Sequence, residues 1–154
     1  ISVYNEGTKA GRVTKIVDQL PTGLKFSSLS ESAKNIYDAT WDATTNKVTF
    51  VRKSTNTENL AAYTNGNLKS ETIEFTCEVT KKASTTDKEV LTNVAWIAEE
   101  YNAVDNLTIT KTKGDDRDSE PETKPNVNKD NMSNYKGNTS NKTADFLWRT
   151  HLAL

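Results

Sequence analysis

Apolar and polar residues alternate along most of the first 110 or so positions, a period of two that is typical of strands with one buried face. The alternation predicts strands at 1–4, 12–18, 24–26, 47–53, 70–80, 90–100 and 106–111. Turn-forming runs such as "NEGTKAG", "LPTG" and "NGN" separate them. In the clearest run, "SETIEFTCEVT", the residues Ile73, Phe75, Cys77 and Val79 share one face. Short strands at this spacing predict an all-β chain folded as an antiparallel β-sandwich.

Three segments depart from this pattern. Residues 27–41 hold either a short helical turn or a broken strand. Residues 112–143 are polar and rich in Asn and Asp, so they predict an extended linker. The tail 144–154, "ADFLWRTHLAL", is either a short helix or a segment foreign to the natural protein. The sandwich is therefore expected to span residues 1–111.

The first residues, "ISVYNEG", contain no initiator Met and begin within a predicted strand. We therefore expect a fragment of a longer protein, truncated at its N-terminus, with the first strand of the sandwich missing. A missing strand would leave a bare sheet edge that can pair with another chain.

Composition excludes several classes of function. The 154 residues include 20 Lys and Arg against 21 Asp and Glu, and this balance provides no basic surface for nucleic acid. The sequence contains no run of 18 apolar residues, the length that would predict a membrane-spanning helix. One cysteine and one histidine exclude an intrachain disulfide and a cysteine-rich zinc site, and Cys77 is expected to be a small buried hydrophobe. We expect neither a cofactor nor enzymatic turnover.

One polar residue stands out in the stretch "VLTNVAWIAEE", residues 90–100. In a strand, Asn93 shares a face with the apolar residues Leu91, Ala95 and Ile97. Burying an amide without partners costs about 1–3 kcal/mol, so Asn93 needs a polar partner. Hydrogen bonds to neighbouring backbone groups are the simple explanation, and a reactive role is the other.

Two stretches carry a resemblance to a known family. "YNEGTKAGRVTKIVDQLPTGLKF" at 4–26 contains "N-x-G" and then "D-x-LP-x-G-L", and "LKSETIEFTCEVTKK" at 68–82 precedes the "TNVAW" of the Asn93 strand. Together they resemble the immunoglobulin-like repeats of Gram-positive, clostridial-type surface adhesins and pilins, especially the A-type domain of collagen-binding adhesins. The resemblance implies a structural stalk module on the cell wall of a Gram-positive bacterium. Its partners would be neighbouring repeats of the same protein, with a host or matrix protein as a further partner.

The resemblance also implies a role for Asn93. Domains of this type form an isopeptide bond between a Lys and an Asn, assisted by a buried acid that is protonated and hydrogen-bonds to the amide carbonyl. Asn93 matches the acceptor and Asp18 the acid, and the Lys belongs to a strand absent from this chain. Lys15 is not assigned, because its spacing from Asp18 puts it on the opposite face of the strand. Asp18 has a simpler alternative, which is to brace the "QLPTG" turn.

Two further interpretations stay open. The run "DDRDSE" offers Asp116, Asp118 and Glu120 as weak candidates for a hard cation, although such a charged run is usually only solvated.

The second concerns binding. An adhesive module could contact a host or matrix ligand directly through loops at one end. The aromatic residues available for such a surface are Trp41, Tyr63, Trp96 and Tyr101. Core or interface packing is the alternative for Trp96.

Overall fold

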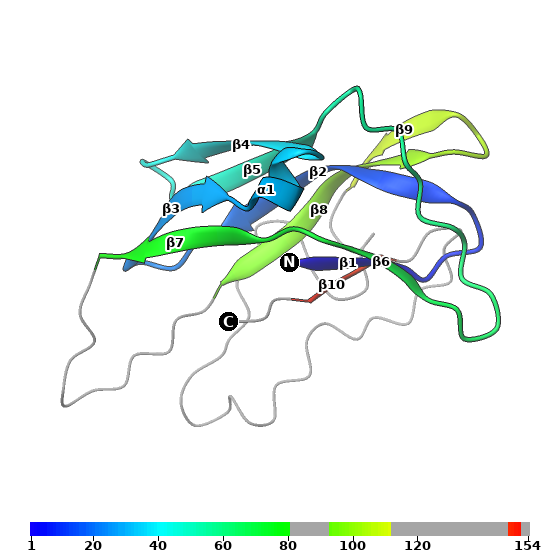
Figure 1. Ribbon diagram of the computed structural model, residues 1–154, viewed down its shortest axis with the longest axis horizontal. Helices are drawn as coiled ribbons and strands as arrows, with labels where there is room; N and C mark the ends of the chain where they lie inside the picture. The colour runs from blue at the N-terminus through cyan, green and yellow to red at the C-terminus, as the bar shows by residue number, and fades with distance from the viewer. Residues whose placement is uncertain (81–92, 112–147, 152–154) are drawn as a thin grey trace.

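The computed structural model describes residues 1–80, 93–111 and 148–151, and these are mostly antiparallel β-strands (Figure 1). The prediction of an all-β chain is therefore confirmed. The described strands are β1 (Ser2–Asn5), β2 (Gly11–Gln19), β3 (Leu24–Leu29), β4 (Tyr37–Asp42), β5 (Lys47–Arg52), β6 (Lys69–Thr72), β7 (Phe75–Val79), β8 (Val94–Asn102), β9 (Leu107–Thr110) and β10 (Trp148–His151). The one described helix, α1 (Glu31–Lys34), has four residues, and no described helix is long and apolar enough to cross a membrane.

The strands form three antiparallel sheets. A five-stranded sheet has the order β4-β5-β2-β8-β9, a three-stranded sheet has the order β10-β1-β6, and β3 pairs with β7. The two small sheets cover one face of the five-stranded sheet (Figure 1). Ring contacts join the β3–β7 sheet to the five-stranded sheet, because Phe50 of β5 lies 6.4 Å from Phe26 of β3 and 5.2 Å from Phe75 of β7 between ring centroids.

The core lies between these sheets and follows the alternation of the strands. In β2, Val13, Ile16 and Asp18 point inward, and the bulge between Val13 and Ile16 accounts for the change of phase. The buried apolar residues are Val3, Val13, Ile16, Leu20, Leu29, Ala33, Tyr37, Val48, Phe50, Ile73 and Ile97. Inward-facing positions of β2 and β8 therefore place side chains among apolar neighbours.

Two predicted turns form for identifiable reasons. In "LPTG", the Leu24 N–H donates to Pro21 O at 3.1 Å, and Gly23 has a φ of +103°, which a type II turn requires at that position. In "NGN", Asn65 and Gly66 both have positive φ, and the Asn67 N–H donates to Thr64 O at 2.8 Å.

The run 70–80 was predicted as a single strand, and the structure divides it. Residues 69–72 form β6 beside β1, and residues 75–79 form β7 beside β3. The hydrogen-bonded partner changes between Ile73, which bonds to Ile1, and Glu74, which bonds to Ser30, and the side-chain alternation does not reveal this change. Ile73 is fully buried as expected, whereas Val79 is 69% exposed because it lies at the end of β7.

The structure also decides between the alternatives for residues 27–41 and changes the expectation for residues 148–151. Residues 27–41 contain both of the proposed features, since β3 ends at Leu29 and α1 precedes β4. Ser30 caps the N-terminus of this helix, because its Oγ accepts from the Ala33 N–H at 3.2 Å. A helix over 144–154 is wrong for residues 148–151, which form β10 beside β1, so the strand at 107–110 is not the last one. The predicted linker, 112–143, lies outside the described residues.

Candidate functional site

Asp18 occupies an interior position near the middle of the five-stranded sheet. It lies on β2, opposite Val48 of β5 and Ala95 of β8, and is 0% exposed. Its inward neighbour along β2 is Ile16, also fully buried. The strand alternation that builds the core therefore also puts a carboxyl group inside it.

Asn93 directly precedes β8 and meets Asp18 from the adjacent strand. Its Nδ2 donates to Asp18 Oδ1 at 2.6 Å. Ala95 and Ile97 follow on the same face, as the alternation predicted, since they pair with Asp18 and Ile16. The structure thus brings together the two residues singled out from the sequence, and the partner that Asn93 needs is a side chain rather than backbone.

Two oxygens of this pair, Asp18 Oδ2 and Asn93 Oδ1, are shielded from solvent and accept no hydrogen bond from the residues that the structure describes. Both oxygens are acceptors, so only a hydrogen-bond donor could satisfy them.

The protonation state of Asp18 follows from its surroundings. Burial raises its pKa from an ordinary 3.8 to about 6, and the hydrogen bond from Asn93 opposes this shift only in part. Burial also raises the pKa of the half-buried Cys77 thiol, with a further contribution from the charge of Asp18, so Cys77 lies in the same region. Near neutral pH, Asp18 can therefore exchange a proton, as a general acid or base must.

The orientation of the amide differs from the expected one. A protonated acid was expected to donate to the Asn93 carbonyl, whereas here the amide nitrogen donates to the carboxyl. An ionised carboxylate can only accept, so it attracts the NH₂ group. Protonation of Asp18 gives it a donor, and rotation of the amide would then present Oδ1 to it.

The lysine that an isopeptide bond would need is not found beside this pair among the described residues. No hydrogen bond or ion pair joins a described lysine to Asp18 or Asn93. Lys15 lies on the other face of β2, paired with Glu99 of β8, as its spacing predicted.

The alternative role of Asp18 as a brace for the "QLPTG" turn is wrong. That turn is held by Asn46, whose Nδ2 donates to the carbonyls of Leu20, Pro21 and Leu24 at 3.1–3.2 Å. Asn46 has a φ of +56°, which Asn tolerates better than most residues. Sequence reasoning missed Asn46; its position at the end of "DATTN" between two strands was the available signal.

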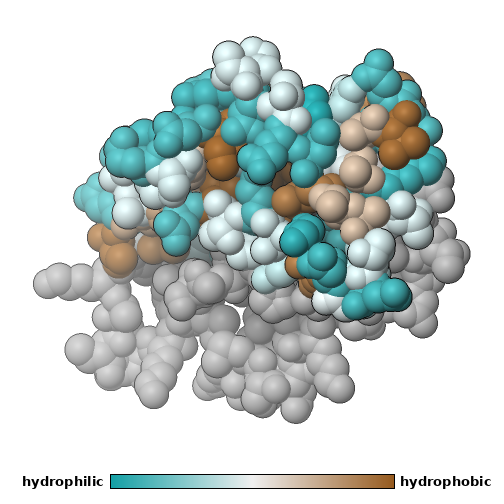
Figure 2. Space-filling model, turned by 45° about the vertical axis from the view of Figure 1, so that its right-hand side comes forward, coloured by the Kyte–Doolittle hydropathy of each residue, from teal (hydrophilic) through white to brown (hydrophobic). Residues whose placement is uncertain are grey.

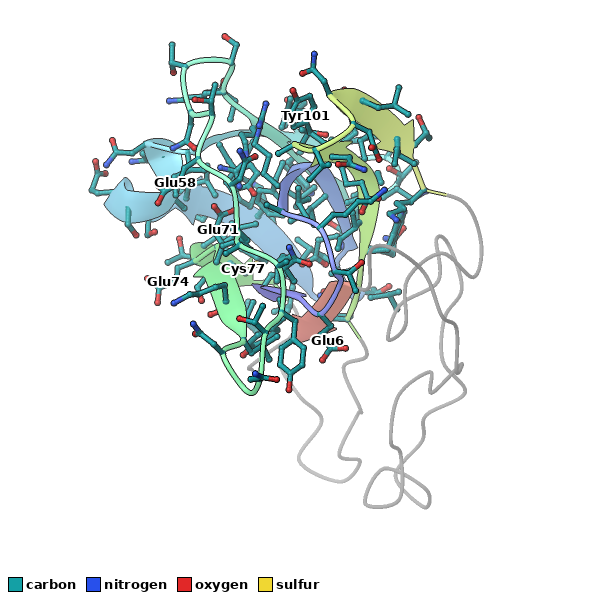
Figure 3. All side chains as sticks on the ribbon, turned by 90° about the vertical axis from the view of Figure 1, so that its right-hand side faces the viewer. Glu6, Glu58, Glu71, Glu74, Cys77 and Tyr101 are labelled. Carbon is teal, nitrogen blue, oxygen red and sulfur yellow. The ribbon has the colours of Figure 1, made fainter. Side chains whose placement is uncertain are left out.

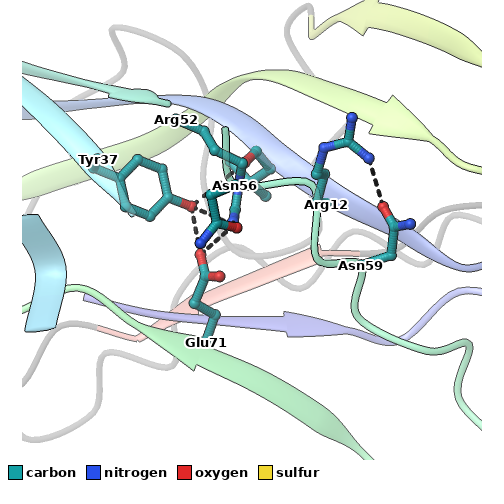
Figure 4. A network of polar contacts seen from close by, with 7 residues as sticks. Arg12, Tyr37, Arg52, Asn56, Asn59 and Glu71 are labelled. Carbon is teal, nitrogen blue, oxygen red and sulfur yellow. Dashed lines mark hydrogen bonds and ion pairs between the residues drawn. The ribbon is translucent and has the colours of Figure 1, made fainter. Parts of the chain in front are cut away.

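A second buried polar cluster also escaped sequence reasoning (Figure 4). Arg52 Nη2 donates to Tyr37 Oη at 2.8 Å and to Glu71 Oε1 at 2.5 Å, and Tyr37 Oη donates to the same Glu71 oxygen at 2.5 Å. Arg52 Nε also donates to Val13 O at 2.7 Å. The cluster ties β4 and β5 to β6, so it joins the large sheet to the three-stranded one. Arg52 Nε, Nη1 and Nη2, Tyr37 Oη and Glu71 Oε1 all have hydrogen-bond partners, which indicates a structural role.

A third polar pair lies at the β8–β9 edge. Lys111 Nζ is 2.7 Å from Glu100 Oε1, and the two side chains are 7% and 1% exposed. Glu100 pairs with the core residue Val13 across the sheet, so this ion pair lies on the inner face.

The weak metal candidates Asp116, Asp118 and Glu120 lie outside the described residues. Elsewhere, the described part of the chain contains no group of three or more His, Cys, Asp or Glu that could hold a metal ion. Comparison with protein-family models, with curated proteins and with solved structures finds no match to this chain.

Proposed function

We propose that this chain is an immunoglobulin-like β-sandwich module serving as a structural stalk in a bacterial cell-surface adhesin or pilin, with Asp18 and Asn93 as the acid and the acceptor of a Lys–Asn isopeptide site. The contact between Asp18 and Asn93 in the apolar interior carries this proposal. A buried acid beside a part-buried amide, each with a shielded oxygen that lacks a partner among the described residues, costs stability, and bond formation would remove polar groups from the interior.

The chemistry balances with three groups. A neutral lysine nitrogen attacks Cγ of Asn93 while protonated Asp18 donates to Oδ1. The bond from Cγ to Nδ2 then breaks, and Nδ2 leaves as ammonia with a proton relayed through the Asp18 carboxyl. The product is one new amide bond, without a change of oxidation state. Because this happens once, it is maturation rather than turnover.

The location suits a load-bearing element. β2 and β8 are central neighbours in the five-stranded sheet and pair from Gly11 to Gln19. A covalent bond at Asn93 would fix one end of β8 to the strand that supplies the lysine. Pulling the module from its ends would then have to stretch a bond rather than only unzip hydrogen bonds.

A lysine introduced beside the pair tests the proposed chemistry. Ile1 packs against the core on the same face as Val3. Burial lowers the pKa of the Ile1 amino group and the nearby charge of Asp18 opposes this, so position 1 lies near the acid. In Ile1→Lys, we expect intact-mass spectrometry to find a mass about 17 Da below the calculated value, the loss of one ammonia.

The matched control is Ser2→Lys, because Ser2 hydrogen-bonds to Thr72 Oγ1 at 3.2 Å on the exposed side of β1. It should keep its full mass, as should Ile1→Lys combined with Asn93→Ala. A folded Ile1→Lys protein with its full calculated mass across pH 5–8 would contradict the proposal.

An adhesive module that grips a host or matrix ligand itself is the second candidate. On the face seen in Figure 2, hydrophilic residues dominate and apolar residues reach the surface in separate places. Three of the four aromatic side chains considered for such a surface lie against cations: Lys25 over Trp41, Lys47 over Trp96 and Arg12 over Tyr101. Saturable binding of immobilised collagen or fibronectin by the chain would favour this alternative.

A further inference from the structure

A surface turn at residues 64–67 joins the loop after β5 to β6. In Figure 3 the chain runs from Glu58 down to this turn and back up to Glu71. Asn65 and Gly66 form the tip of the turn, and both are exposed to solvent. No other Asn in the sequence is followed by Gly. The tip therefore places a side-chain amide directly before a backbone nitrogen that no Cβ shields.

The side chain of Asn65 differs from those of the two other described Asn residues that have positive φ. Asn46 donates to three carbonyls of the "QLPTG" turn, and Asn106 accepts from the Tyr101 hydroxyl. The Asn65 side chain makes no hydrogen bond to any residue that the structure describes. Its amide is therefore free to turn toward the next peptide bond, whereas the other two amides are held.

The Gly66 nitrogen is not held by backbone pairing. The hydrogen bond that closes the turn runs from the Asn67 N–H to Thr64 O at 2.8 Å, so it does not use this nitrogen. The Gly66 N–H donates instead to the Tyr63 hydroxyl at 3.2 Å, and Tyr63 is 45% exposed, so water competes for that contact. A Cβ built at Gly66 would meet no atom within 4 Å beyond its chain neighbours. The peptide bond before Gly66 therefore has room to rotate.

We propose that Asn65 is a site of spontaneous covalent modification, in which the exposed turn deamidates in the folded protein. The Gly66 nitrogen attacks Cγ of Asn65, and Nδ2 leaves as ammonia with the proton from that nitrogen, so a cyclic succinimide forms. Water then opens the ring. Breaking the bond from Cγ to nitrogen gives aspartate, and breaking the bond from the backbone carbonyl carbon gives isoaspartate. Neither step changes an oxidation state, and the proposal is independent of the isopeptide site.

Both products change the turn while leaving the core in place. Either product adds one negative charge to a chain whose formal net charge is −1. Isoaspartate also adds a carbon to the main chain, so Thr64 and Asn67 lose the register of the bridge between them. Just before the turn, the Tyr63 N–H donates to Gly7 O at 2.9 Å, and just after it β6 pairs with β1. The change is therefore confined to the segment between these two attachments.

Ageing of the whole folded chain in neutral buffer, followed by tryptic peptide mapping, tests the proposal. Trypsin releases residues 54–69 as one peptide, which contains Asn56, Asn59, Asn65 and Asn67. We expect the mass of this peptide to rise by about 1 Da, with fragmentation placing the first change at Asn65. Asn59 is an internal control, because it is exposed but is followed by the bulky Leu60. Change at Asn59 or Asn67 as fast as at Asn65, or none at Asn65, would overturn the proposal.

Two variants separate ring closure at this turn from general ageing. Asn65→Gln should abolish the mass rise, because its longer side chain must close a larger ring, whereas the matched control Asn67→Gln should retain it. Hydrogen exchange of the Asn67 N–H should become faster in the aged wild type but not in aged Asn65→Gln. An equal mass rise in Asn65→Gln would overturn the proposal. A succinimide also lowers the mass by one ammonia, about 17 Da, but it lies within the 54–69 peptide, whereas an isopeptide bond would join the peptide that contains Asn93 to a second one.

Discussion

Replacing Asp18 by Asn should stabilise the protein at neutral pH while leaving it almost unchanged in acid. The folded protein holds the Asp18 proton more tightly than the unfolded chain does, because burial raises the pKa of this carboxyl from 3.8 to about 6. Ionising the group above pH 6 therefore costs stability that a neutral amide does not lose. Asn has nearly the same shape and keeps an oxygen that can accept from Asn93.

The magnitude follows from the two pKa values. A carboxyl whose pKa is raised on folding contributes its full stability below about pH 4, and this contribution falls as the pH rises from about 4 to 6. With about 1.4 kcal/mol for each tenfold change in the dissociation constant, the loss is about 3 kcal/mol. The direction is opposite to that of an ordinary salt-bridged aspartate, which destabilises the protein as the pH falls.

Urea unfolding of both proteins between pH 4 and pH 8 measures the difference directly. The free energy of unfolding of Asp18→Asn minus that of the wild type should be near zero at pH 4 and reach about 3 kcal/mol by pH 7. Asp42→Asn is a control, because Asp42 lies in an exposed turn where hydrogen bonds from Thr45 and Thr44 lower its pKa. A difference that does not change with pH, or that grows toward acid, would refute the reasoning.

Three other substitutions have expected outcomes, each measured by urea unfolding at pH 7. Arg52→Met should cost about 3–5 kcal/mol, because it leaves the Glu71 carboxylate without its buried cation; a loss below about 1 kcal/mol would show that the cluster is dispensable. Asn46→Ala should cost about 2–3 kcal/mol, since it frees three turn carbonyls and Ala tolerates a φ of +56° less well than Asn, and Asn46→Gly should recover part of that loss. Lys111→Met should cost about 3 kcal/mol, because it removes the cation that lies 2.7 Å from Oε1 of the buried Glu100, and an equal loss in Lys111→Arg would argue against charge pairing as the cause.

Much of the fold was predictable, because the alternation of apolar and polar residues along a strand indicates which side chains are buried. The shared face of Asn93, Ala95 and Ile97 was identified from sequence, whereas the bulge in β2 that turns both Val13 and Asp18 inward was not. The partner of a strand was less predictable, since one continuous run can pair with β1 along one half and with β3 along the other. Strand β10 was missed because its pairing joins residues nearly 150 positions apart, and no local pattern encodes such a contact.

The candidate site was predictable only in part, and for a related reason. Asn93 could be singled out because it is a polar residue on an otherwise apolar face of a predicted strand. A family resemblance then indicated Asp18 as its partner. The buried Arg52 cluster gave no such signal, because Arg52 ends a strand where a solvated side chain is the ordinary outcome. Its burial depends on Tyr37 and Glu71 arriving from two other strands. Contacts of this kind follow from topology and not from any local run of residues.

The central claim is that Asp18 is a buried acid whose only hydrogen-bond partner among the described residues is Asn93. A ¹³C NMR titration of the Asp18 side-chain carboxyl tests it most directly. The account predicts a midpoint near pH 6 that moves higher in Asn93→Ala, where the stabilising hydrogen bond is lost. A midpoint at or below pH 4, or one that does not respond to Asn93→Ala, would contradict it.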